Sequence, residues 1–223
     1  MTVALLHTSS VHVPTFDALF SEIAPGLLLR HFTREHLLDL AVKQSDRPAL
    51  VAGAVRAVVT EAACAASIVL CTCSTIGAYA ESTQGVRVVR VDRPMSRHAV
   101  RTAERVHVIA TLRDALPATL SLLHEEATQV GHDVRVTSSV VPDAWSTFLS
   151  GHLDDYLDQV ARHVESVAGT VDVVVLAQAS MAGSLALLNI ETPVLTSPRL
   201  AVREVVRLVG PEGPYEVTAH GSL

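Results

Sequence analysis

The sequence predicts an α/β protein made of two similar halves, each a four-stranded parallel sheet flanked by helices. Two observations support this fold class. Strand-like apolar runs alternate with helical patterns along the chain, and the second hundred residues repeat landmarks of the first. The composition agrees, because 49% of the 223 residues are hydrophobic but only 4% are aromatic. A core of Val, Leu, Ile and Ala is typical of parallel sheets that are buried on both faces.

The repeat is clearest at two strand ends. Residues 68–77 (IVLCTCSTIG) and 173–183 (VVVLAQASMAG) both run from an apolar β-branched stretch into small and hydroxyl residues. This pattern indicates a buried strand that ends at a helix N-terminus, which is where open α/β sheets bind ligands. The offset is 105 residues if Cys73 matches Gln178, or 106 if the glycines that end the two segments match, and the sequence leaves both alignments open.

Other landmarks follow at nearly the same period. Residues 3–8 match 106–111 at a shift of 103, and Pro94 loosely matches Pro198 at a shift of 104. We therefore expect two pseudo-symmetric, Rossmann-like domains. Residues 1–98 plus 201–223, which include a returning C-terminal helix, would form the first half, and residues 99–200 the second. From Gly210 onward, Pro and Gly predict a loop or frayed end.

The individual elements follow from periodicity and from start and stop signals. Strands are expected at 3–7, 27–31, 67–71, 86–91, 106–110, 134–138, 172–176 and 193–196. Helices are expected at about 14–24, 47–65, 75–83, 95–102, 113–130, 152–168, 181–188 and 198–208. Pro14, Asp114 and Pro198 are good helix starts, and Gly85 and Gly131 are good stops.

Charge and composition exclude several functional classes. The net charge is −6 and no basic cluster occurs, which argues against a nucleic-acid partner. No apolar stretch reaches membrane-spanning length and no basic leader follows Met1, so we expect a cytoplasmic protein without membrane contact. Lys43 is the single lysine, in a polar helix end, which disfavours Schiff-base chemistry.

Cys73 is the strongest catalytic candidate. It follows a strand end at a predicted helix start, where the dipole and free amides stabilise a thiolate that can act as base or nucleophile. Cys64, within an Ala-rich helix, and Cys71, in a strand, are expected to be buried and inert. A C-x-C pair without a second cluster supplies too few ligands for a metal, and three cysteines do not make a disulfide framework.

Hydroxyl side chains recur at the predicted strand ends and in the turns that follow. They are Thr8, Ser9, Ser10, Ser74, Thr75, Thr111, Ser180, Thr196 and Ser197. Together they could cradle a carboxylate or a developing enolate, or each could simply cap a helix. His7, at the first strand end, could assist proton transfer or serve as a structural histidine. Arg93 and Arg199 could each pair a second carboxylate, or form surface ion pairs.

The order of these motifs resembles the aspartate/glutamate/hydantoin racemase superfamily, which also contains maleate cis–trans isomerases and arylmalonate-type decarboxylases. The motifs are Leu-Cys-Thr-Cys-Ser-Thr after a strand, the matching small-residue turn about a hundred positions later, and Ala110-Thr111 at the fifth strand. The resemblance extends in order from His7-Thr8 to Thr196-Ser197-Pro198. It implies a cofactor-independent isomerase or racemase that acts on a small carboxylate in the interdomain cleft, and a homo-oligomer.

The second half departs from the superfamily pattern. Typical racemases place one cysteine from each half on opposite faces of the substrate carbon, whereas this chain has Gln178-Ala179-Ser180 after the seventh strand and no cysteine elsewhere in that half. A two-thiol racemase is therefore excluded, since Gln and Ala do not titrate and Ser180 would need an activating base. The expected catalytic residues are Cys73, Ser180 and Gln178. The expected substrate-binding residues are His7, Thr8, Ser9, Ser74, Thr75, Thr111, Ala179, Thr196 and Ser197.

Three functional interpretations remain open at this point. The first is isomerisation or racemisation of an amino acid, hydantoin or dicarboxylate with an unusual second acid. The second is a one-thiol decarboxylation, or a maleate-like double-bond isomerisation through a covalent cysteine adduct. The third is a non-catalytic protein that binds a small anion. No cofactor and no metal are expected in any of them.

Overall fold

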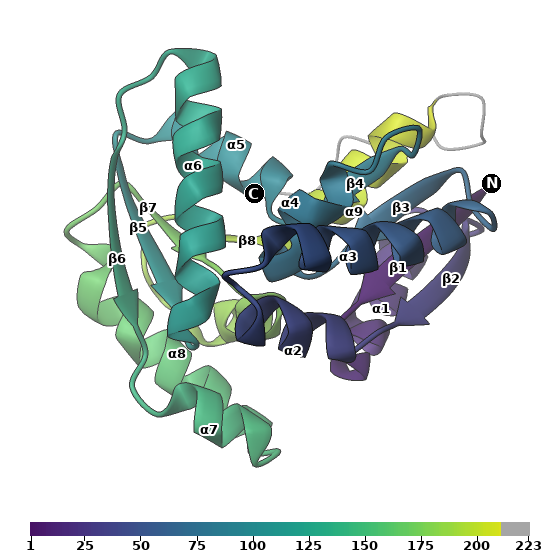
Figure 1. Ribbon diagram of the computed structural model, residues 1–223. Coiled ribbons are helices and arrows are strands. Elements are labelled where there is room, and N and C mark those ends of the chain that lie inside the picture. The colour runs from purple at the N-terminus through teal and green to yellow at the C-terminus, as the bar shows by residue number, and fades with distance from the viewer. Residues whose placement is uncertain (211–223) are drawn as a thin grey trace.

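A computed structural model describes residues 1–210, and Pro211 and the rest of the expected C-terminal loop lie outside the described residues. Two four-stranded parallel sheets, each flanked by helices, make up the molecule (Figure 1). The first sheet contains β1 (Thr2–His7), β2 (Leu28–Thr33), β3 (Ile68–Cys71) and β4 (Val88–Arg90), in the order β2-β1-β3-β4. The second contains β5 (Arg105–Ala110), β6 (Arg135–Val140), β7 (Val173–Leu176) and β8 (Val194–Thr196), in the order β6-β5-β7-β8. The expected fold class and all eight expected strands are confirmed.

The helices alternate with the strands along the chain. In the first half they are α1 (Val13–Ile23), α2 (His36–Lys43), α3 (Pro48–Ala63), α4 (Ser74–Glu81) and α5 (Arg93–Thr102). In the second they are α6 (Leu116–Val130), α7 (Ala144–Leu149), α8 (Leu153–Ala168) and α9 (Ser197–Val209). Short 3-10 segments are η1 (Ser10–His12), η2 (Arg113–Ala115) and η3 (Ala179–Leu187).

The sequence reading differs from the structure at three elements. Helices α2 and α7 are absent from the prediction because both are short, and α7, with six residues, is too short to show a helical period. The expected helix at 181–188 is a 3-10 segment, η3. Within η3, a Cβ on Gly183 would come within 2.9 Å of the Leu157 side chain, so the glycine permits a close approach to α8.

The strand registers settle the alignment of the two halves. Leu6 of β1 pairs with Cys71 of β3, and the corresponding residue of β5, Ile109, pairs with Leu176 of β7. Two residues beyond each of these partners lie Cys73 and Gln178, which are the N-caps of α4 and η3 with similar extended backbone angles. Cys73 and Gln178 therefore occupy equivalent positions, and the offset of 105 residues is the correct one.

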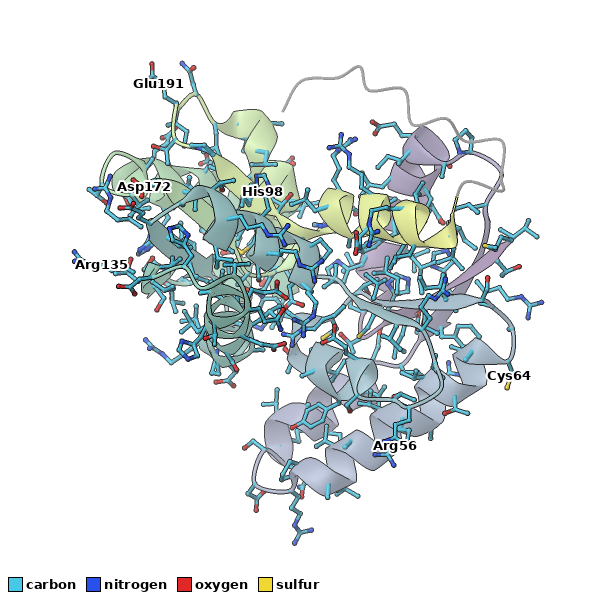
Figure 2. All side chains as sticks on the ribbon, turned by 90° about the horizontal axis from the view of Figure 1, so that it is seen from above. Arg56, Cys64, His98, Arg135, Asp172 and Glu191 are labelled. Carbon is cyan, nitrogen blue, oxygen red and sulfur yellow. The ribbon has the colours of Figure 1, made fainter. Side chains whose placement is uncertain are left out.

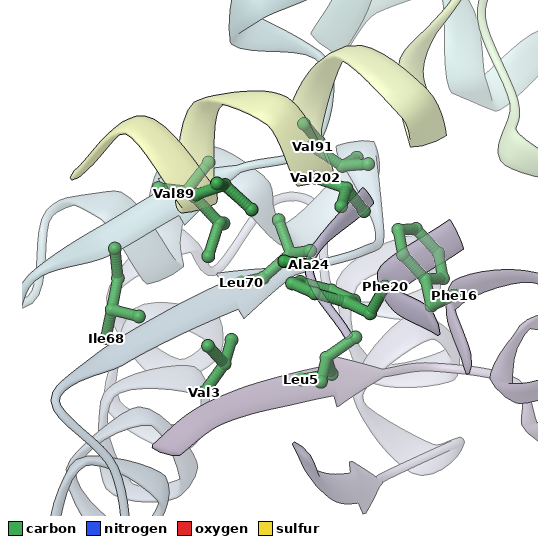
Figure 3. Close-up of a cluster of buried hydrophobic side chains, with 13 residues drawn as sticks. Val3, Leu5, Phe16, Phe20, Ala24, Ile68, Leu70, Val89, Val91 and Val202 are labelled. Carbon is green, nitrogen blue, oxygen red and sulfur yellow. The ribbon is translucent and has the colours of Figure 1, made fainter. Parts of the chain in front are cut away.

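Two helices exchange places between the halves. Helix α9 packs on the first sheet, where Val202 joins the core cluster that contains Leu70, Val89 and Val91 (Figure 3). Helix α5 packs instead under the second sheet, where Met95 and Ala99 join the core around β5 and β7. Each sheet is thus covered by a helix that is adjacent in sequence to the other half. The division of the chain into two domains stays a prediction.

An ion-pair cluster lies between the halves. Arg93 of α5 bonds Glu81 of α4, and it reaches Glu125 at 2.9 Å and Glu126 at 2.5 Å on α6. Glu126 is buried and also accepts a bond from Arg97 Nε at 3.0 Å. Because one guanidinium contacts carboxylates from helices of both halves, the cluster fixes how the two sheets face each other. In residues 1–210 no helix is long and apolar enough to cross a membrane.

Candidate active site

A cleft of about 500 Å³ lies where the strands β1, β3, β5 and β7 end. This volume is within the usual range for small-molecule sites. Residues from both halves line it: Thr8, Ser9, His12, Glu35, His36, Leu38, Asp39, Thr72, Cys73, Ser74, Thr75, Leu112, Ala115, Trp145, Phe148, Leu149, Gln178, Ala179 and Ser180. Eight of the twelve expected site residues are among them. The other four are His7, Thr111, Thr196 and Ser197.

Cys73 lines this cleft at the point where β3 passes into α4. The buried strand β3 ends at Cys71, and the chain then remains extended through Cys73, which caps α4. Cys73 is half-buried and lines the cleft, so its thiol is placed at a helix N-terminus and within reach of a ligand. Ser74, the first residue of α4, donates to the carbonyl of Ala177 at 3.3 Å, which ties the two strand ends together across the halves.

The other two cysteines differ from each other. Cys71 is fully buried as expected, and burial raises the pKa of its thiol far above the ordinary value. Cys64, by contrast, is exposed at the end of α3 and bonds only the Thr60 carbonyl, at 3.4 Å (Figure 2). The expectation that Cys64 is buried is therefore wrong, because the residue follows the last turn of the helix rather than lying on its apolar face.

Gln178 is held in one orientation by three hydrogen bonds. Its side-chain oxygen accepts from the backbone amide of Thr111 at 2.7 Å, from the Thr111 hydroxyl at 3.0 Å, and from the amide of Leu112 at 3.2 Å. Backbone amides only donate, so the oxygen must be the atom that faces them. The amide nitrogen is then the end of the side chain left for the cleft, and it is a donor. Thr111 itself is buried and acts on the site through Gln178.

Ser180 belongs to a second hydroxyl network. Its Oγ lies 2.8 Å from the hydroxyl of Tyr156, which in turn lies 3.5 Å from the Thr111 hydroxyl. Tyr156, on α8, is fully buried, and burial raises the pKa of its phenol above the ordinary value. The sequence analysis missed Tyr156, because a tyrosine on the apolar face of a helix is read as core. The one local sign was that a residue with a polar hydroxyl stands among the Val and Ala residues of that face, where the hydroxyl needs a partner.

The remaining hydroxyl residues divide between the cleft and the core. Thr8, Ser9 and Thr75 line the cleft, and Ala179 lines it beside Ser180. Thr196 and Ser197, by contrast, are buried where β8 passes into α9 and are not among the lining residues.

His7 lies beneath the cleft rather than in it. It is fully buried, its Nδ1 lies 2.9 Å from the Thr72 hydroxyl, and its Nε2 lies 2.9 Å from Nδ1 of His31. His31 Nε2 contacts Asp17 Oδ1 at 2.9 Å. Asp17 accepts, so His31 Nε2 donates to it. The Thr72 hydroxyl has one proton, and two acceptors lie within its reach: the Leu6 carbonyl at 3.1 Å and Nδ1 of His7. Burial, together with the nearby His31 and His12, lowers the pKa of His7 to about 3, which keeps His7 neutral.

Two short helices supply the walls of the cleft, and both were missed from sequence. Glu35, His36 and Asp39 come from the start of α2, whereas Trp145 and Phe148 come from α7. Figure 1 shows α2 and α7 on the same, lower side of the molecule. Since each helix follows the edge strand of its own sheet, the two are pseudo-equivalent and close the site from opposite halves.

The two arginines considered for carboxylate binding are engaged elsewhere. Arg199 forms a bidentate pair with Glu22, with both distances 2.7 Å, and Arg93 is held in the cluster between the halves. Neither lines the cleft, so the surface or interface ion pair is the interpretation that holds. Within residues 1–210, no three His, Cys, Asp or Glu side chains gather as metal ligands.

No known family model and no curated protein matches the chain in sequence. Solved structures match it closely in fold. An aspartate racemase from Picrophilus torridus superposes with a TM-score of 0.69 at 11% identity, over 93% of each chain. Allantoin racemase from Klebsiella pneumoniae gives 0.59 at 16% identity, over 94% of this chain and 87% of that one. An arylmalonate decarboxylase gives 0.54 at 12% identity, over 96% and 94%. The chain therefore has the fold of the aspartate/glutamate racemases, allantoin racemase and arylmalonate decarboxylase, as the resemblance in its sequence predicts.

Proposed function

We propose that this protein is a cofactor-independent enzyme that moves a proton at the carbon next to a carboxylate, with Cys73 as the proton-carrying group. The observation that carries the proposal is the position of Cys73. Cys73 is the N-cap residue of α4 and lines the cleft, and the other half presents donors at the equivalent strand end. The first backbone amides of a helix are not bonded within it, so those of α4 can donate to an anion at this position.

The second half supports the charge that develops on the substrate. When a proton leaves the α-carbon, negative charge moves onto the carboxylate oxygens, and donors fixed in advance stabilise it. Gln178 offers its amide NH₂ because its oxygen is occupied. Ser180 offers its hydroxyl proton when it accepts from Tyr156. Neither group is ionised, so both act as neutral donors.

The same geometry bears on the outcome of the reaction. For Ser180 to protonate the carbon, it would have to recover a proton from Tyr156 and leave a buried phenolate. Burial raises the pKa of Tyr156, so this phenolate is unfavourable. Transfer on the Cys73 face is therefore favoured over two-sided racemisation. A decarboxylation fits as the second candidate: the bond to the leaving carboxylate breaks, CO₂ departs, and the Cys73 thiol gives its proton to the enediolate carbon.

The test is proton exchange in heavy water, followed by NMR at the α-carbon of aspartate, glutamate and a 5-substituted hydantoin, with CO₂ release from phenylmalonate measured in parallel. All variants carry Cys64→Ala, so that this second solvent-accessible thiol cannot contribute to the exchange. We expect exchange or CO₂ release that Cys73→Ala abolishes while the fold is retained. Binding of these compounds without either reaction would support the non-catalytic anion binder and overturn the proposal.

A further inference from the structure

The cleft has a distinctive charge distribution. Among the described residues that line it there is no lysine or arginine; besides the histidines His12 and His36, its acidic side chains are Glu35 and Asp39 at the start of α2, both exposed. The cation beside them is engaged: Arg34 bonds Glu61 at 2.9 Å. Lys43 lies 3.4 Å from Asp39 in an exposed pair on the outer turn of α2.

This arrangement disfavours a substrate with a carboxylate at each end. One carboxylate can be held by the amides and hydroxyls at the strand ends near Cys73, without a cation. A second carboxylate in the body of the cleft would find no lysine or arginine among the lining residues, and on the α2 side it would lie near the exposed carboxylates of Glu35 and Asp39. A buried or half-buried carboxylate without a partner is costly.

The wall opposite α2 is aromatic. Trp145 and Phe148 stack with ring centroids 5.2 Å apart and planes 22° apart, and Phe148 also packs on Tyr156 at 5.1 Å. Tyr156 in turn bonds Ser180. Trp145, Phe148 and Tyr156 therefore form a continuous aromatic series that ends beside Ser180. Leu112 and Ala115 extend this apolar surface on the second half.

We propose that the substrate carries its carboxylate at the reacting carbon near Cys73 and, at its other end, not a second carboxylate but a bulky apolar group, preferably aromatic, that packs on Trp145 and Phe148. The inference rests on the proposed function for the place of the carboxylate. It replaces an aspartate- or glutamate-like side chain with an arylalkyl one. A cationic or N–H group on the substrate would face α2, where the carboxylates lie.

The single tryptophan of the chain makes a direct test possible, because Trp145 is at the cleft. Its fluorescence is titrated with phenylacetate and with glutarate, using N-acetyltryptophanamide to correct for collisional quenching. We expect a saturable change with phenylacetate and none with glutarate. Phe148→Leu should weaken phenylacetate about two- to tenfold, the range expected for loss of one aromatic contact. Phe32→Leu, the same change at a residue that does not line the cleft, should leave affinity unaltered.

A gain-of-function variant sharpens the test. Asp39→Arg places a cation on the α2 wall and should create glutarate binding. Equal or tighter binding of glutarate by the unaltered protein, or no saturable binding of phenylacetate, would overturn the inference. Its failure can be told apart from failure of the proposed function. Cys73-dependent exchange on glutamate would keep the function and reject the arylalkyl substrate, whereas phenylacetate binding without Cys73-dependent chemistry on any arylalkyl acid would do the reverse.

Discussion

The two halves of the molecule have one architecture and different chemistry. The strand orders and the registers of the central pairs are the same, so each position in the first sheet has a counterpart in the second. At the N-cap after β3 stands Cys73, and at the N-cap after β7 stands Gln178. One half thus presents a group that can carry a proton, while the other presents a fixed hydrogen-bond donor.

The difference extends to the surroundings of these two caps. The first half has titratable groups, with His7 beneath Thr72 and the carboxylates of α2 above. At the positions of His7 and Thr72 the second half has Ala110 and Ala177, and its short helix α7 is aromatic. Under the proposed function, the duplicated scaffold separates two roles: one copy would hold the reacting group, and the other would supply neutral hydrogen-bond donors and an aromatic wall.

The largest effect should come from exchanging the two cap residues for alanine one at a time. Cys73→Ala should lower the rate of proton exchange or CO₂ release by about 10²- to 10⁴-fold, the range for removal of a general acid or base. Gln178→Ala should lower it less, by about tenfold, because a neutral donor is lost. Steady-state kinetics on the same substrate measures both. Equal losses would mean that both caps are catalytic and that the asymmetry is only apparent.

Much of this comparison could be predicted from sequence. Buried parallel strands are continuous apolar runs, and their ends are marked by small and hydroxyl residues, so the eight strands and Cys73 were recognisable from local pattern. The walls of the site were not. Helices α2 and α7 are short and draw their order from packing, and the Tyr156–Ser180 contact joins residues 24 positions apart. No local signal encodes which buried tyrosine reaches a particular serine.

The second largest effect concerns the loss of folding stability in acid. We expect His7 to contribute to this loss, whereas its counterpart Ala110 cannot titrate. The pKa of His7 falls to about 3 on folding, from about 6.5 in an unfolded chain. The stability that neutral His7 contributes is complete above pH 6.5 and is lost as the pH falls from there toward 3. The slope is at most about 1.4 kcal/mol per pH unit. His12, His107 and His163 also have lowered pKa values and add to the same trend.

Urea unfolding at pH 7.5, 6 and 5 tests this assignment. The variant His7→Asn should be less stable than the unaltered protein at pH 7.5, since it breaks the contacts with Thr72 and His31. Its stability should also fall less steeply with acid. Parallel curves for the two proteins would show that the acid sensitivity arises from the other histidines.

A smaller effect is expected from the hydroxyl network of the second half. Tyr156→Phe removes the partner of Ser180 while keeping the ring that packs on Phe148. Losing one neutral hydrogen bond costs about 1 kcal/mol, so turnover should fall about fivefold, with the stereochemistry of proton transfer unchanged. Thr111→Val is the matched variant, because it removes a hydroxyl bond to Gln178 instead. If Tyr156→Phe abolished turnover, the phenol would be the second acid, and the one-sided reading of the site would be wrong.

Gln178→Cys should give the smallest rate, a slow racemisation. It is also the sharpest test of the difference between the two halves. The registers identify position 178, and not 179, as the equivalent of Cys73. The amides of Thr111 and Leu112, which now donate to the Gln178 oxygen, would lose this acceptor in the variant, and the shorter side chain would leave space between them and the new sulfur. The variant should begin to racemise a substrate that the unaltered protein exchanges with retention, and chiral chromatography of the product in heavy water measures this. Ala179→Cys is the control, since its side chain leaves the strand end one residue later. If racemisation appeared with Ala179→Cys and not with Gln178→Cys, the geometric equivalence of the two caps would not be the chemical one, and the substrate would have to lie nearer to η3 than to the end of β7.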